Sequence, residues 1–281
     1  MLTRHALLCS IAIASLTSAA GAQSPGIVFD QQLVMQRPTG KTDTILTRSV
    51  ESTERYRTEY VRSSAAIPFM RTGMTQLVTA GDSDLTIVFV DSARKMYAEM
   101  KTSAMLSGMG AMGATMKFDS TGDSTRLDSI GPGPMVAGHA TIHFQMHSGS
   151  RMSMAVFGDT SVRTMAITTD FYVAPDLMLD SSGRDSTRAK AAVDRLRAMT
   201  RGLPGVDALA AKASKAAKRL AKYGTPLKTV TETTITGPAG SVTRHSSMET
   251  LTYERKIVPD SLFVIPMGYK KVPLMDFVSQ F

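Results

Sequence analysis

Polar and apolar residues alternate without interruption over residues 139–147, HATIHFQMH. A period of two residues is typical of a β-strand with one buried face. In a helix, the apolar residues of this stretch would fall on two opposite sides, and no single face could be buried. On a strand, His139, His143 and His147 are spaced roughly 13 Å apart, which is too far to bind one metal ion. The pattern therefore predicts a half-buried strand whose three histidines do not bind one metal ion together.

Short runs rich in Thr, Val, Ile and Tyr occur along much of the chain, separated by polar or Gly/Pro turns. Runs spaced this closely predict antiparallel strands joined by hairpins, and they disfavour alternating strands and helices. Besides 139–147, the predicted strands are residues 27–36, 44–52, 55–63, 76–80, 85–90, 96–100, 152–157, 162–173, 227–236 and 242–256.

A methionine-rich segment follows the strand predicted at 96–100. Its methionines are three to five residues apart, which suits one face of a helix, but Gly108, Gly110 and Gly113 weaken a helix there. We interpret the segment as a flap or a fraying helix. Its methionines could fill gaps in the core, line a site for an apolar ligand, or bind Cu(I). The candidates for ligand contact are Met100, Met105, Met109, Met112 and Met116.

Residues 184–222 hold eleven Lys or Arg and three Asp, so their net charge of +8 equals that of the whole chain. Two helices are predicted here, at 186–201 and 206–223, with a Gly-Leu-Pro-Gly break between them. Their apolar stripes are narrow and rich in Ala. We therefore expect the helices to lie on the sheet, because such stripes are too thin for a helix bundle.

The basic residues of these helices could form a solvated face, or they could contact anionic lipid headgroups or an acidic partner. Nucleic acid is a poor fit, because Tyr223 is the single aromatic residue available for stacking on a base. The candidates for anionic contact are Arg188, Arg195, Lys212, Lys215, Lys218 and Arg219.

Residues 1–22 have the features of a secretory signal: a basic start at Arg4, a short apolar run, and a small-x-small cleavage site ending at Ala22. The run is too short to span a bilayer, and no later stretch reaches the ~20 apolar residues of a membrane helix. The single cysteine, Cys9, lies within this leader, so the mature chain would have no disulfide. We expect an exported protein, periplasmic or extracellular, with 23–281 as one domain and 184–223 as a helical insertion.

The closing sequence VPDSLFVIPMGYKKV, residues 258–272, resembles the end of an uncharacterised family of secreted bacterial domains, in which a Pro-x-x-x-Phe-x-x-Pro-x-Gly-Tyr run follows the last strand. Residues 136–139, 170–177 and 223–230 fit the same family. The chain departs from it at Tyr172, where Trp is more common. This family is similar in pattern to the lipoprotein-carrier superfamily of LolA and LolB type.

The resemblance implies an α+β, mainly β fold: a curved antiparallel sheet, or half-barrel, with two basic helices and the Met-rich flap covering one face. It also implies a concave face that binds acyl chains. Ile142, Phe144 and Met146 would then join the methionines as ligand contacts. The resulting expectation is a non-enzymatic, exported protein that binds a lipid or other hydrophobic ligand and needs no cofactor or metal.

Two other functions stay open at this stage. The first is a metalloprotein or hydrolase that uses His139, His143, His147 or His245. Serine-esterase chemistry is disfavoured, because the Gly-Asp-Ser near-match at residues 81–84 lacks the alternating strand and helix pattern of such enzymes. The second is a structural envelope protein with a filled core.

Overall fold

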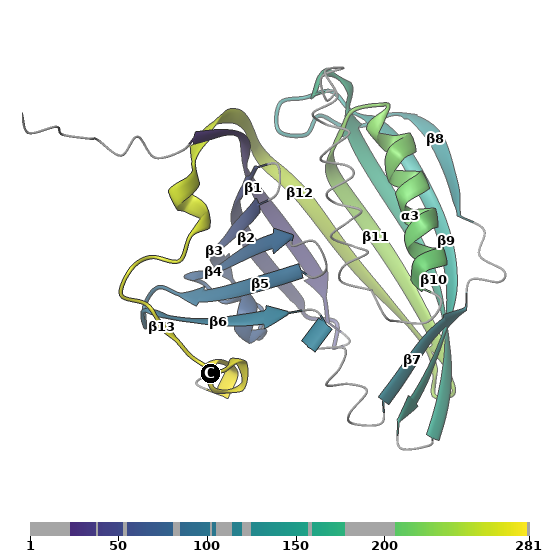
Figure 1. The fold of residues 1–281 in the computed structure, drawn as a ribbon. Coiled ribbons are helices and arrows are strands. Elements are labelled where there is room, and N and C mark those ends of the chain that lie inside the picture. The colour runs from purple at the N-terminus through teal and green to yellow at the C-terminus, as the bar shows by residue number, and fades with distance from the viewer. Residues whose placement is uncertain are drawn as a thin grey trace, which may run out of the picture.

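The computed structural model describes residues 23–37, 39–52, 55–80, 85–101, 103–104, 114–119, 125–156, 159–177 and 206–279. Its strands form one curved sheet (Figure 1). They are β1 (Gln23–Gln36), β2 (Thr42–Glu51), β3 (Arg55–Ser63), β4 (Met74–Ala80), β5 (Leu85–Asp91), β6 (Met96–Lys101), β7 (Ala114–Asp119), β8 (Arg126–Pro132), β9 (Ile142–Val156), β10 (Asp159–Ala174), β11 (Thr225–Gly237), β12 (Gly240–Pro259) and β13 (Lys270–Lys271). The helical segments are η1 (Pro68–Met70), η2 (Pro175–Leu177), α3 (Val206–Ala221), η3 (Asp260–Phe263) and α4 (Leu274–Ser279).

The strand order is β13-β6-β5-β4-β3-β2-β1-β12-β11-β10-β9-β7, and β8 also pairs with β9. Neighbouring strands are antiparallel, except that β13 runs parallel to β6. Within the described residues the sheet stays open, and the long strand β12 joins its two halves (Figure 1). The prediction of a mainly β, curved antiparallel sheet is confirmed. The helix predicted at 206–223 is α3, whereas the one predicted at 186–201 lies outside the described residues.

Two predicted boundaries are wrong. The strand predicted at 139–147 begins only at Ile142, because Val136 and His139 close a tight turn with paired backbone hydrogen bonds of 2.9 and 3.0 Å. Ala137 and Gly138 have positive φ in this turn. The alternation of polar and apolar residues therefore starts at His139, in the turn, before the strand begins at Ile142. The Met-rich segment was predicted to be a flap up to residue 116, but Ala114–Asp119 is a strand, paired along its length with β9.

The register places two of the apolar clusters, one around Ile45 and one around Phe144, on the same face of the sheet. Residues directly opposite one another in a sheet share a face. One such row crosses six strands through Ile45, Leu33, Met248, Thr229, Phe171 and Phe144. The next row, on the opposite face, runs through Leu46, Gln32, Glu249, Lys228, Tyr172 and His143. We call the face that includes Ile45 and Phe144 the inner face, and the other the outer face.

The chain end ties the N-terminal half of the sheet together. Directly after β12, Asp260 accepts hydrogen bonds from Ser24 at 2.7 Å and Arg55 at 2.6 Å, and the Arg55 guanidinium lies 4.8 Å from the ring centre of buried Phe263. The chain then pairs β13 with β6 and ends in α4, where Phe277 is fully buried. The motif at 258–272 is therefore the segment that closes this half of the fold.

Gly224 is required by the fold where α3 turns into β11. Its φ is +133°, and a Cβ atom there would lie 2.1 Å from the Ala174 carbonyl oxygen. We expect Gly224→Ala to lower the free energy of unfolding by roughly 3 kcal/mol in urea denaturation. Gly240→Ala is the matched control, because Gly240 has a φ of +111° with open space around it. The control should lose only about 1 kcal/mol. Equal losses in the two variants would contradict this account.

The Asp260 contacts predict a pH effect on stability. The hydrogen bond from Ser24, followed by that from Arg55, lowers the pKa of Asp260. A lowered pKa stabilises the folded state above the unfolded value of about 4, and this contribution is lost as the pH falls through the folded value. Asp260→Asn should therefore lower the urea midpoint at neutral pH, and its difference from wild type should shrink below about pH 4. A difference that is constant with pH would refute a role of the charge.

Candidate functional site

The inner face carries an apolar cluster beneath α3. Leu127, Phe144, Val173 and Leu220 are buried together, and Ile142, Met146 and Phe171 pack against them. Leu220 comes from α3, and the ring of Tyr223, just after this helix, lies 4.7 Å from the ring of Phe144. Tyr223 is nevertheless 45% exposed. We call these residues the α3 cluster.

Leu220 holds the second part of α3 on the sheet. Among the α3 side chains that the structure describes, those buried are Ser214, Ala216 and Leu220. Only Leu220 among them is large and apolar. Since burial of apolar area is what fixes a surface helix to its sheet, Leu220 is the main apolar anchor among the described side chains of α3.

A second apolar cluster fills the inner face of the N-terminal half. Ile45, Leu85 and Phe89 are buried there, and the chain covers them with Phe69 of η1 and Phe277 of α4. The rings of Phe69 and Phe89 stack at 4.2 Å. Tyr60 donates a hydrogen bond to Gln76 at 3.1 Å, and burial raises the pKa of Tyr60 to about 12. This cluster is a filled core.

Between the two clusters, the inner face is lined by hydroxyl groups. Two residues along from the Phe144 row, on the same inner face, a second row has Met35 and Met146 at its ends and hydroxyl residues between them. Thr169 and Thr231 are hydrogen-bonded at 3.3 Å, while Thr231 itself is only partly buried. We call this strip the hydroxyl band; its residues are Thr169, Thr229, Thr231, Ser246 and Thr250.

The structure divides the residues predicted to contact an apolar ligand. Ile142, Phe144 and Met146 lie together in the α3 cluster. Met100 packs in the second cluster, on the other half of the sheet. Met116 lies on β7, in a position whose side chain the structure does not describe, and Met105, Met109 and Met112 lie outside the described residues. The apolar residues of the alternating stretch 139–147 that were predicted as ligand contacts thus belong to the α3 cluster.

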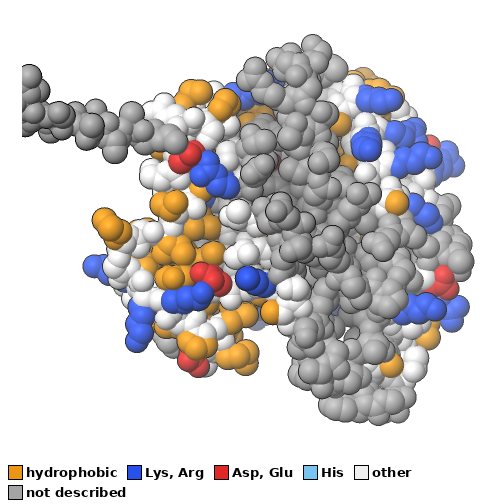
Figure 2. Space-filling view, in the orientation of Figure 1, with side chains coloured by type: hydrophobic (Ala, Val, Ile, Leu, Met, Phe, Trp, Pro, Cys, Tyr) orange, Lys and Arg blue, Asp and Glu red, His pale blue; other side chains and the backbone are white. Residues whose placement is uncertain are grey.

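The predicted basic residues that can be placed lie on α3. Lys215, Lys218 and Arg219 are exposed and Lys212 is partly buried, whereas Arg188 and Arg195 lie outside the described residues. Figure 2 shows Lys and Arg side chains gathered over the side of the molecule that carries α3. Within the part of the chain that the structure describes, no helix is long and apolar enough to cross a bilayer.

The histidines of β9 point to the outer face and form a polar network there. His143 Nε2 lies 2.8 Å from Asp170 Oδ1, and its ring stacks on Tyr172 at 4.8 Å. Gln145 donates to the same Asp170 oxygen at 3.0 Å and lies 2.9 Å from His147. None of the described residues form a group of three His, Cys, Asp or Glu suited to a metal ion.

The other two histidines that the metal hypothesis names each lie beside a single carboxylate. His139 Nδ1 lies 2.6 Å from Asp176, and this contact lowers the pKa of Asp176. His245 Nδ1 lies 3.6 Å from Glu232. Each contact orients one imidazole ring on one carboxylate.

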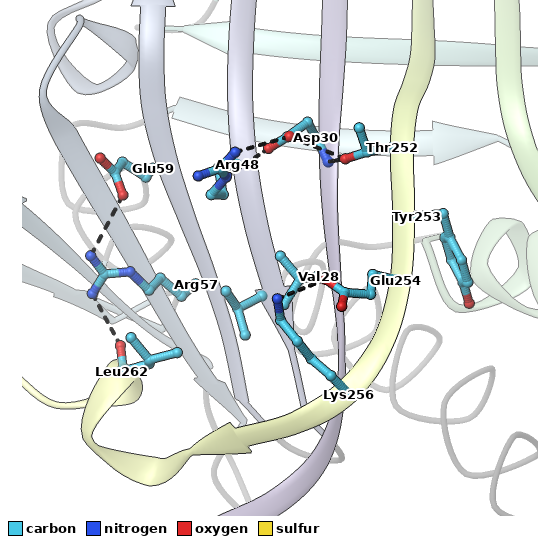
Figure 3. A pocket seen from close by; sticks show the side chains of 11 residues that line it. Val28, Asp30, Arg48, Arg57, Glu59, Thr252, Tyr253, Glu254, Lys256 and Leu262 are labelled. Carbon is cyan, nitrogen blue, oxygen red and sulfur yellow. Dashed lines mark hydrogen bonds and ion pairs between the residues drawn. The ribbon is translucent and has the colours of Figure 1, made fainter. Parts of the chain in front are cut away.

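A groove of about 520 Å³ on the outer face was not found from the sequence (Figure 3). Val28 and Val50 lie in its floor, and Leu262 of η3 forms one wall. Arg48 pairs with Asp30 through two hydrogen bonds of 2.9 and 3.1 Å and lowers the pKa of Asp30. The other charged lining residues are Arg57, Glu59, Glu254 and Lys256, which also pair with one another. Its charges therefore neutralise each other, between β1 and β2 in the Arg48–Asp30 pair and within one strand in the other two pairs.

No family model and no curated protein matches this chain. Among solved structures, it is similar to an uncharacterized conserved protein from Thermus thermophilus, with 9% identity, a TM-score of 0.35, and coverage of 89% of this chain and 90% of that one. It is also similar to PNGF-II, with 11% identity, a TM-score of 0.33, and coverage of 92% of this chain and 33% of that one. A third similar structure is a putative outer membrane lipoprotein-sorting protein domain from Vibrio parahaemolyticus, with 9% identity, a TM-score of 0.25, and coverage of 92% of this chain and 90% of that one. The family suggested by the 258–272 motif thus stays a prediction.

The role of Leu220 in holding α3 on the sheet can be tested by truncating its side chain. We expect Leu220→Ala to cost about 3 kcal/mol locally and to release α3 before the sheet unfolds. Trypsin, which cleaves after Lys and Arg, should then cut α3 first under native conditions. Leu85→Ala in the second cluster is the control, and it should expose the whole domain to cleavage. Identical cleavage patterns in the two variants would rule out an independently releasable α3.

Proposed function

We propose that this chain is an exported, non-enzymatic protein that binds a lipid-like molecule on the inner face of its sheet, beneath α3. The observation that carries the proposal is the α3 cluster. It gathers Ile142, Phe144 and Met146 on one face of the sheet, next to Leu220 of α3. Apolar ligands bind to concave surfaces lined mostly by apolar side chains, with a few polar groups to orient them.

The hydroxyl band favours an amphiphile over a pure hydrocarbon. Thr229, Thr231 and Ser246 are only partly buried, and they lie beside the α3 cluster in the same cross-strand rows. Hydroxyl groups can both donate and accept hydrogen bonds. A lipid with an ester, amide or hydroxyl group next to its chains would place the polar group on the band and the chains on the cluster.

Export is proposed from the leader, residues 1–22. The predicted cleavage after Ala22 would leave Gln23 as the first residue, and β1 begins at Gln23, paired with Pro259. Cleavage there would keep the whole of β1 in the mature chain. It would also keep Ser24 in its hydrogen bond with Asp260.

Native mass spectrometry of protein purified without detergent should detect a bound lipid, and solvent extraction should release a molecule that carries a hydrogen-bonding group. Uptake of a fluorescent fatty-acid analogue would provide an affinity. A ligand-free protein that also fails to take up the analogue would refute lipid binding. That result would favour a structural protein with a filled interior.

Two neighbouring residues of β9 on opposite faces locate the site. Met146→Gln should weaken binding of the fatty-acid analogue roughly tenfold, since losing one apolar contact costs about 1.4 kcal/mol. His147→Gln changes the outer face of the same strand and should leave the affinity unchanged. Circular dichroism would verify that both variants are folded. Equal affinities in the two variants would exclude the α3 cluster as the site.

A further inference from the structure

Three basic residues of α3 differ from many of those on the sheet in their lack of acidic partners. On the sheet and its turns, many Lys and Arg side chains form ion pairs: Arg37–Asp43, Arg48–Asp30, Arg55–Asp260, Arg57–Glu59, Arg126–Asp128, Lys228–Glu249 and Lys256–Glu254. Among the described residues, Lys215, Lys218 and Arg219 form no ion pair. The helix contains a single acidic residue, Asp207. The positive charge of these three side chains is therefore not neutralised within the described part of the molecule.

These charges lie together on the solvent side of the helix. Residues three and four apart are neighbours on a helix surface, and this spacing links Lys215, Lys218, Arg219 and Lys222, the last directly after α3. All four are exposed. Leu220 is buried against the sheet, so it lies on the opposite side of the helix. We call these four residues the basic stripe; Figure 2 shows the Lys and Arg side chains on this side of the molecule.

We propose that the basic stripe docks this protein on the surface of an anionic lipid bilayer. Three of its four residues are Lys, whose flexible stems and compact charges suit a diffuse layer of headgroups. Paired recognition of carboxylates on a protein would favour Arg, because its planar guanidinium binds them in a bidentate way.

The proposal is independent of the lipid ligand. The stripe faces solvent, whereas the α3 cluster lies on the other side of the helix. If a ligand is also bound, the surface that meets the bilayer belongs to the element that covers the ligand. A variant of the stripe should then keep its bound lipid, as measured by native mass spectrometry, and the two proposals can fail separately.

The test is co-sedimentation with phosphatidylcholine vesicles that contain or lack phosphatidylglycerol. The wild-type protein should bind only the vesicles with phosphatidylglycerol, and high salt should release it. The triple variant Lys215→Gln, Lys218→Gln, Arg219→Gln should bind about a hundredfold more weakly, at about fivefold per charge, or about 1 kcal/mol each. Gln keeps a helix propensity close to that of Lys and Arg, so the helix should persist.

The matched control is Lys41→Gln, Arg62→Gln, Arg244→Gln, which removes three exposed charges of the sheet and its turns. It lowers the net charge equally and should retain nearly all binding, while circular dichroism checks the fold of both variants. Equal losses in both triple variants would show that only net charge matters and would overturn the assignment to α3. The assignment would also be overturned if the wild-type protein did not bind vesicles with phosphatidylglycerol at low salt. An acidic protein would then be the next partner to test.

Discussion

The register of β12 against its two neighbours is the constraint on which the rest of the structure depends. This strand pairs with β1 on one side and with β11 on the other, so every row that joins the two halves of the inner face passes through it. A slip of one residue would turn its side chains to the opposite face. Met248 would then leave the row that links Ile45 to Phe144, and the two apolar clusters would no longer share a face.

The two halves of the inner face are covered in different ways. In the N-terminal half, the chain end crosses to the sheet edge at β13 and buries Phe277 of α4 beside Phe69. That half is closed by its own sequence and stabilises the domain. In the other half, α3 covers Phe144 and its neighbours through Leu220. Among the side chains that the structure describes, the first half is thus covered by several large apolar residues and the second by Leu220 of α3.

The two faces of the sheet also divide the chemistry. The outer face carries paired charges and histidines, such as Arg48 with Asp30 and His143 with Asp170, which satisfy one another across neighbouring strands. The inner face carries the two apolar clusters, which flank the hydroxyl band. The charge of the basic stripe is carried by α3, away from both faces.

The sequence by itself determined many of the strands, since alternation is a local pattern, and strands such as Thr225–Gly237 follow from it. The α3 helix was also predicted from the sequence. The tertiary structure alone decided which strands are neighbours and where the groove beside Leu262 lies. It also decided that β9 begins only at Ile142, after the turn between Val136 and His139. The reason is physical: side-chain alternation belongs to one segment, whereas register and coverage depend on residues more than two hundred positions apart, such as Ser24 and Asp260.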